Sequence, residues 1–226
     1  MLTEEEIYNI YEEQEAKKEP QKRSIVESLA KVMSTIFSPL LVPTYGIIIA
    51  LNFTFVSLLS PLSSRIIVSL AILAFTCMVP IMSIALLYRF NKVTDLGVNN
   101  QKERFIPYTI SILSYITSAI YLANLNAPQW MSMFLVGAGL SAIASALINI
   151  KWKISAHGAG MGGLVALAFS IWANGYASFD YIYLTSALIL LAGIVGSSRI
   201  ILKCHTLGQV FAGTLNGFFW VFIMTI

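Results

Sequence analysis

The sequence predicts an all-α membrane protein, a polytopic transmembrane helix bundle of six or seven spans. Of its 226 residues, 57% are hydrophobic and only 11% are charged, which is outside the range of soluble globular domains. From about residue 36 onward, apolar runs alternate with short polar breaks, and a helix needs about 20 apolar residues to cross a bilayer. We therefore expect a polar N-terminal tail (1–35) followed by one transmembrane domain (36–226).

Seven apolar runs are candidates for the spans. Clusters of Ser, Pro, Gly and Asn separate them, as is typical of turns between helices. Tryptophans lie near the ends of several runs, where an aromatic belt meets the membrane surface. The spans are placed near residues 36–60, 66–89, 108–126, 129–150, 158–175, 181–200 and 206–226.

The N-terminal tail is polar before any apolar run begins, so we expect it not to be a signal peptide. A solvated tail is the favoured interpretation; the alternative is a surface helix with Ile7, Ile10 and Tyr11 on one side. Cys77 and Cys204 lack the spacing of a metal site, and we expect both to be reduced thiols.

Basic residues are distributed unevenly along the chain. Eight of the eleven acidic residues lie between residues 4 and 27, so the apolar body carries a surplus of Lys and Arg. Following the predicted spans, the tail and the loops 90–107, 151–157 and 201–205 emerge on one face. Thirteen of the fourteen Lys and Arg residues lie there, with Arg65 opposite. The positive-inside rule assigns this face to the cytoplasm, and we expect the plasma (inner) membrane.

The two histidines, His157 and His205, each lie in a polar cluster beside an apolar run. Ionisable groups at a membrane boundary are costly to desolvate, so such clusters indicate a functional site. Ser155 is a candidate N-cap that would present backbone N–H groups, including that of Gly158, as an anion site. Arg199 and His205 would lie about 240° apart on one continuous helix, so the helix must break for both to reach one ligand.

Three short motifs occur in order between residues 90 and 215. Ser198-Arg199 is followed after five residues by His205 and after three more by Gln209. Ser155-Ala156-His157 precedes this motif, and Arg104 with a nearby proline, Pro107, precedes both. In this order and spacing the chain resembles the type 2 phosphatidic acid phosphatase family of membrane lipid phosphatases. It departs from the family pattern at Ile154, where proline is usual, at Gly97, where the first motif has lysine, and at Gln209, where the family has aspartate.

The resemblance implies a phosphatase that needs neither metal nor cofactor. His205 would attack phosphorus and form a phosphohistidine. His157 would protonate the leaving lipid oxygen and then activate water. Lys102 or Lys153 would replace the missing motif lysine. The implied phosphate-binding groups are Arg104, Arg199, Ser155 and Gly158, which would hold the equatorial oxygens.

Gln209 has two interpretations. As a catalytic residue it would orient His205 without supplying the negative charge of an aspartate, which Asp95 or Glu103 would have to provide. As a structural residue it would close the capping box Thr206-x-x-Gln209 at a helix N-terminus. The sequence leaves both open.

Other interpretations also stand beside the enzymatic one. The histidines can be helix-packing hydrogen-bonders, and His157, Cys204 and His205 are conceivable zinc ligands, although no acidic or paired-cysteine partner is nearby. The glycines between 160 and 163, with Gly213 and Gly217, are typical of close helix packing.

The predicted function is hydrolysis of a lipid phosphate monoester or pyrophosphate. The alternatives are a lipid phosphotransferase and a catalytically silent protein of the same fold that binds or carries anionic lipid. We expect a membrane lipid phosphate and the bilayer as partners, and no nucleic acid; the sequence does not indicate an oligomeric state.

Overall fold

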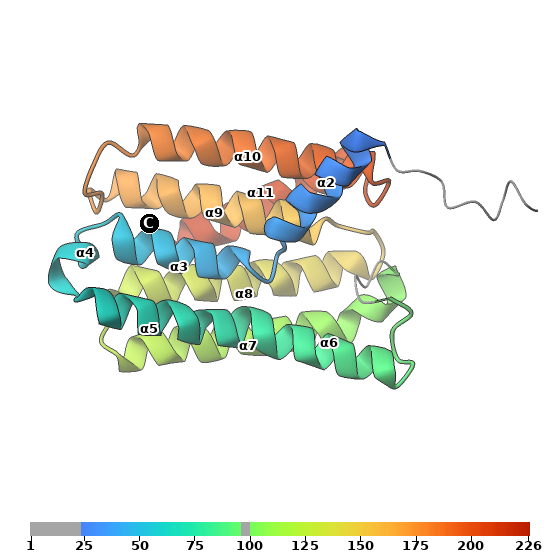
Figure 1. Ribbon diagram of the computed structural model, residues 1–226, viewed down its shortest axis with the longest axis horizontal. Coiled ribbons are helices and arrows are strands. Elements are labelled where there is room, and N and C mark those ends of the chain that lie inside the picture. The colour runs from blue at the N-terminus through green and yellow to red at the C-terminus, as the bar shows by residue number, and fades with distance from the viewer. Residues whose placement is uncertain (1–23, 96–99) are drawn as a thin grey trace, which may run out of the picture.

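The computed structural model describes residues 24–95 and 100–226, which form a bundle of helices (Figure 1). Six helical segments in this part of the chain are long and apolar enough to cross a membrane, and no strand occurs in it. The predicted all-α bundle is therefore confirmed. In chain order the elements are α2 (Ile25–Ile36), α3 (Val42–Asn52), α4 (Val56–Leu59), α5 (Leu62–Leu73), the π-helical turn η1 (Ala74–Met78), α6 (Val79–Arg89), the 3-10 turn η2 (Gln101–Arg104), α7 (Phe105–Asn124), α8 (Gln129–Asn149), α9 (Ala156–Ala173), α10 (Ile182–Ile201) and α11 (Leu207–Thr225).

The predicted first span, 36–60, is not one helix. It is divided into α3 and the four-residue α4, and the chain breaks at 37–41 before α3 begins. With 11 residues, α3 is about 16 Å long, roughly half the thickness of the hydrocarbon core. The seven-span count is therefore corrected to six long spans and one short apolar helix.

The first long span, Leu62–Arg89, is continuous through a π-helical turn. Pro80 lies in the first turn of α6 and has no N–H to donate to the preceding turn, a common cause of such irregularities. Thr76, within the turn, donates to the Ile72 carbonyl at 2.9 Å and is 3.1 Å from the hydroxyl of Thr44 on α3. The irregular turn thus anchors the short helix α3 against the long span.

Helices α9 and α11 make the closest packing in the bundle, through glycines on both sides. A side chain at Gly162 would collide with the Thr214 backbone, and one at Gly217 would collide with the Ala159 carbonyl. This confirms the predicted packing role of these glycines, and small residues are what allow helices in lipid to approach so closely. The contact also fixes the two histidines relative to each other, because each lies at the start of one of these two helices or just before it.

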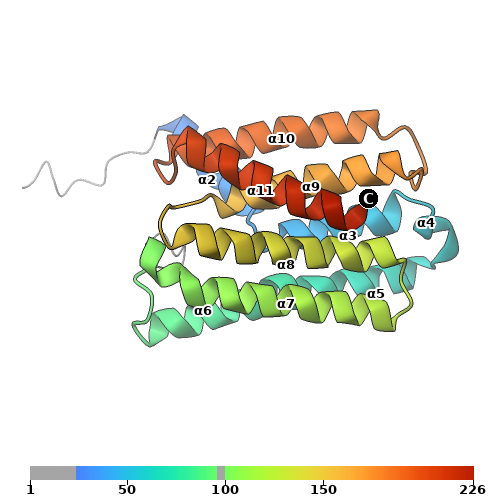
Figure 2. The same ribbon diagram turned by 180° about the vertical axis from the view of Figure 1, so that it is seen from behind.

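The polar loops gather at one end of the bundle. The α6–α7 connection, the α8–α9 loop and the α10–α11 turn all lie at the end where α2 begins, as both views show (Figures 1 and 2). Arg65 lies at the opposite end, where its Nη1 donates to Asn52 Oδ1 at 2.8 Å. The predicted grouping of the described basic loops on one face is confirmed. Residues 1–23, including the alternative helix with Ile7, Ile10 and Tyr11, lie outside the described residues.

The end of the predicted tail, from residue 25 to residue 35, forms helix α2 together with Ile36, and this helix runs obliquely across α9 and α10 at the polar end (Figure 1). The helix begins at Ser24, whose hydroxyl accepts from the Glu27 N–H at 3.1 Å, while the Glu27 carboxylate accepts from the Ser24 N–H. This reciprocal capping box explains why a helix starts here.

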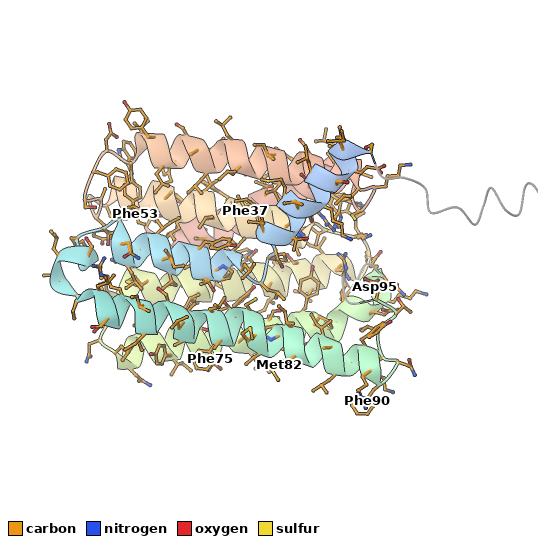
Figure 3. The ribbon with its side chains drawn as sticks, in the orientation of Figure 1. Phe37, Phe53, Phe75, Met82, Phe90 and Asp95 are labelled. Atoms are coloured by element: carbon orange, nitrogen blue, oxygen red, sulfur yellow. The ribbon has the colours of Figure 1, made fainter. Side chains whose placement is uncertain are left out.

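Apolar side chains cover the outside of the bundle. Met82 and Phe90 project away from the other helices (Figure 3) and are 63% and 68% exposed. Aromatic side chains also pack at a bend between helices. Phe37 and Tyr45 pack edge to face, with their ring centroids 6.0 Å apart, where the chain passes from α2 to α3. An apolar exterior around a packed interior is the arrangement that a lipid environment requires.

Candidate functional site

A cavity of about 950 Å³ opens at the polar end of the bundle. Most of its lining comes from α2, α7, α8, α9 and the end of α10 with the turn that follows, and residues of the α2–α3 connection, α3, α6 and α11 complete it. The cavity continues between the helices past small residues such as Ala138 and Gly160. Four of the predicted site residues lie on its wall: Arg104, His157, Arg199 and His205. The structure therefore brings together one residue from the first motif, one from the second and two from the third.

Arg104 is held at the start of α7. The preceding turn η2 is tied to the end of α8 because Gln101 Nε2 donates to the Asn149 carbonyl at 2.6 Å and Asn149 Nδ2 donates back to the Gln101 carbonyl at 2.9 Å. Arg104 is buried, and its Nη1 donates to the Ile154 carbonyl at 3.3 Å. This bond joins the first motif to the second.

Ser155 is the N-cap of α9, as the sequence predicts. Its hydroxyl accepts from the Gly158 N–H at 3.2 Å, and its own N–H donates to the Gln209 carbonyl at 3.2 Å. Both Ser155 and Gly158 are buried and neither lines the cavity. The hydrogen bonds of these two predicted phosphate ligands start α9, fix it to α11 and so position His157.

The helix break predicted between Arg199 and His205 is present. Helix α10 ends at Ile201 and α11 begins at Leu207, with Lys203 in a left-handed conformation (φ 53°) between them. The N–H groups of Cys204 and His205 both donate to the Arg199 carbonyl, at 3.0 and 3.3 Å. The chain therefore folds back on Arg199, which places the guanidinium and the imidazole on one cavity.

The Gln209 side chain makes both the capping contact and the histidine contact that its two interpretations require. Its Oε1 accepts from the Thr206 N–H at 3.2 Å, which completes a capping box, and lies 3.1 Å from His205 Nδ1. Because the Thr206 N–H can only donate, the atom it meets is the amide oxygen, and His205 Nδ1 must then carry the hydrogen. In the neutral ring this leaves His205 Nε2 unprotonated, which is the state a nucleophile needs.

His205 is held neutral by its surroundings. Burial lowers its pKa to about 4, and the nearby positive charges of Arg104, Arg199 and Lys153 act in the same direction, while the hydrogen bond to Gln209 raises it. Burial and the neighbouring positive charges both disfavour the imidazolium form of the ring. At neutral pH His205 is thus an unprotonated base facing an electropositive cavity.

The two candidate lysines have different places. Lys102 is exposed and does not line the cavity. Lys153 lies near the site: burial lowers its pKa, and Arg104 and Arg199 lower it further, while Asp95 raises it. Asp95 lies at the polar end of the bundle (Figure 3). Lys153 does not line the cavity either, but of the two it is the lysine within electrostatic range of Arg104 and Arg199.

Glu103 is not placed to supply the negative charge that Gln209 lacks. The Glu103 oxygens accept from the Thr94 N–H at 2.7 Å and from Asn100 Nδ2 at 2.7 Å, within its own loop. Asp95 influences Lys153, but it is not among the groups that shift the pKa of His205. Gln209 therefore remains the residue that orients the candidate nucleophile.

In comparisons with known proteins, no protein-family model, no curated protein and no solved structure matches this chain. Within residues 24–95 and 100–226, no group of three or more His, Cys, Asp or Glu side chains could hold a metal ion, so the zinc alternative lacks a ligand set there. Cys77 and Cys204 are both free thiols.

Sequence reasoning missed the contribution of α2 to the site. Ser34 is 7% exposed and contacts both His157 and Arg199, and Glu27 and Lys31 also line the cavity. The available signal was the capping box at Ser24 followed by polar residues at helical spacing. Lys203, in the α10–α11 turn, is a further cavity residue that no motif indicated.

Gln209→Glu is expected to raise the pKa of His205. Glutamate is a natural capping-box residue, so the start of α11 should persist, while a negative charge against Nδ1 favours the imidazolium, typically by one to three pH units. The protonated ring cannot attack, so activity should be lost at a higher pH than in the wild type. The profile of kcat/KM against pH should therefore have its acid limb displaced upward from near pH 4, with a several-fold gain in turnover at neutral pH.

Thr206→Ala is the matched control for this prediction. It removes a bond of the same capping box without adding charge, so its acid limb should stay in place. An unchanged limb in Gln209→Glu would show that the side chain at 209 does not act on the His205 ring.

Proposed function

We propose that the protein is an integral membrane lipid phosphatase that cleaves a lipid phosphate monoester or pyrophosphate through a phosphohistidine. The observation that carries this proposal is the convergence of His157, His205, Arg104 and Arg199 on one cavity at the polar end of the bundle. The resemblance of these same residues to the ordered motifs of the type 2 phosphatidic acid phosphatase family supports it.

In the proposed reaction, His205 Nε2 attacks phosphorus and the bond from phosphorus to the lipid oxygen breaks. His157, charged as the imidazolium beside the bound phosphate, gives one proton to that oxygen, which leaves as a lipid alcohol or, from a pyrophosphate, as a lipid monophosphate. His157 then removes a proton from water, which attacks the phosphohistidine. Inorganic phosphate leaves, and both histidines return to their starting states.

The arginines are suited to an anion with several oxygens. Arg199 is 9% exposed, and its Nε has no hydrogen-bond partner among the described residues. A buried donor without a partner is costly, and a phosphate oxygen would satisfy it with a charge-assisted bond. Lys153 adds a positive charge beside the same cavity. Such fixed cations stabilise the charge that develops in phosphoryl transfer.

The test is phosphate release by the purified protein from a panel of lipid phosphates in mixed micelles. The panel should include phosphatidate, phosphatidylglycerol phosphate, a phosphoinositide and a polyprenyl pyrophosphate, because the sequence does not choose among these headgroups. We expect release from at least one of them, inhibition by vanadate, which mimics five-coordinate phosphorus, and no effect of chelators. Loss of activity on chelation would replace the metal-free mechanism with a metal-dependent one.

A second candidate function is binding or carriage of anionic lipid without hydrolysis. The specific observation in its favour is Gln209, which orients His205 without a negative charge to stabilise it once it is charged. In serine hydrolases the comparable loss lowers the rate about ten thousand-fold, although the tautomer is also wrong there. Saturable binding of the same lipids without phosphate release would favour this function.

The proposal places the site at the cytoplasmic face of the plasma (inner) membrane. The basic residues of the described loops gather at the polar end, and Arg65 lies at the other end. Lysine and arginine are retained on the cytoplasmic side of membrane proteins, which supports this orientation.

A further inference from the structure

Ser34, on α2, occupies the place where a phosphate group would bind in the proposed site. Its hydroxyl accepts a hydrogen bond from Arg199 Nη1 and lies 3.2 Å from His157 Nε2, and its backbone carbonyl lies 2.9 Å from the same nitrogen. One residue from outside the three motifs thus engages both a phosphate-binding arginine and the proposed acid.

The geometry fixes the direction of these bonds. A carbonyl oxygen can only accept, so His157 Nε2 must carry a hydrogen and donate it to Ser34. In the proposed reaction the charged ring of His157 gives the hydrogen on this nitrogen, which faces the cavity residue Ser34, to the leaving oxygen. The Ser34 carbonyl therefore stands in for the leaving oxygen, and its hydroxyl stands in for an equatorial phosphate oxygen on Arg199.

The attachment of α2 to the bundle is slight. Only Ala30 and Ser34 are buried on this helix, which packs mainly against α10. The opposite face carries an apolar stripe at helical spacing, with Ile25 81%, Leu29 60% and Val32 53% exposed. This stripe continues the apolar exterior of the spans, which suits a helix lying in the membrane interface.

We propose that α2 lies in the membrane interface and acts as a latch on the site. In the resting protein Ser34 occupies the phosphate site, and the headgroup of an incoming lipid phosphate displaces Ser34 and its helix. This inference rests on the proposed function, because it concerns the same cavity. Glu27, Lys31 and Ser34 line that cavity at intervals of four and three residues, so they share one face of α2. Displacement of the helix would expose the whole of this polar face to the entering headgroup.

Ser34→Ala tests the latch on the full chain. The substitution removes the hydroxyl that competes for Arg199, and a hydrogen bond to a charged group is worth roughly a tenfold change in binding. The KM for the lipid phosphate and the inhibition constant of vanadate should therefore fall about tenfold. Ser28→Ala is the matched control, because Ser28 is exposed on the same helix and does not line the cavity; it should change neither constant. A KM that rises in Ser34→Ala would overturn the proposal and make Ser34 part of the productive site.

Hydrogen exchange of the wild-type protein provides an independent measurement. A 12-residue helix that loses its packing is marginally stable, so saturating vanadate should speed the exchange of amides 25–36, while those of α8 should not change. Slower exchange of α2 with vanadate bound would overturn the latch. Failure of the proposed function has a different signature: vanadate would then neither inhibit nor bind, in the wild type or in Ser34→Ala.

Discussion

Replacing His205 with alanine is expected to reduce phosphate release by at least about a thousand-fold while the protein stays folded. The reaction needs an unprotonated nitrogen facing the phosphate, and removal of a nucleophile costs on this scale or more. In the described structure this nitrogen belongs to the ring whose Nδ1 is tied to Gln209. The measurement is initial-rate phosphate release, with circular dichroism and gel filtration in detergent to confirm the fold.

The neighbouring thiol provides the matched control for this substitution. Cys204 also lines the cavity, but its Sγ donates to the Leu202 carbonyl at 3.5 Å, and the proposed reaction gives the thiol no role. Cys204→Ala should therefore keep its rate within a few-fold of the wild type. A His205→Ala protein that still turns over at a comparable rate would show that water attacks phosphorus directly, without a covalent intermediate.

Gly217→Val is expected to have the largest effect on stability. A Cβ at this position would overlap the Ala159 carbonyl oxygen, and backbone atoms cannot move aside as a flexible side chain can. Overpacking of a close contact typically costs 1–3 kcal/mol, and sometimes more. Helices α9 and α11 would have to separate, so the melting temperature in detergent should fall by several degrees and the activity should fall with it.

Gly193→Val isolates the effect of the contact from that of valine in a helix. A Cβ at Gly193 of α10 would meet nothing within 4 Å, so this variant should melt close to the wild type. Equal melting temperatures for the two variants would contradict the assigned role of the α9–α11 contact.

Much of the bundle could be predicted because membrane spans follow from local composition. The N-cap at Ser155 and the helix break before His205 were also accessible, since each depends on a few neighbouring residues. The prediction of one span over residues 36–60 was wrong because residues 37–41 interrupt the helix and α3 then ends at Asn52, although the run is apolar as a whole. Hydropathy averaged over a window does not detect such breaks.

The parts of the site that could not be predicted depend on contacts between distant segments. Ser34 lies 123 residues before His157 in the chain, and only the packing of α2 across α10 places them together. The sequence contained both patterns around Gln209, the motif and the capping box, but not the fact that one oxygen atom serves both. Ser155 differs from these residues, because its role as the N-cap of α9 depends on its immediate neighbours and was predicted from the sequence.

The oxygen shared by Thr206 and His205 makes the proposed nucleophile depend on the integrity of a helix end. If the first turn of α11 frays, the amide of Gln209 leaves its place, and the ring loses the acceptor that selects its tautomer. Helix ends open with far smaller free energies than whole bundles do. On heating, activity should therefore be lost at a temperature at which the spans are still assembled. The temperature of inactivation would then measure the stability of one helical turn, and the temperature of unfolding would measure the stability of the rest of the molecule.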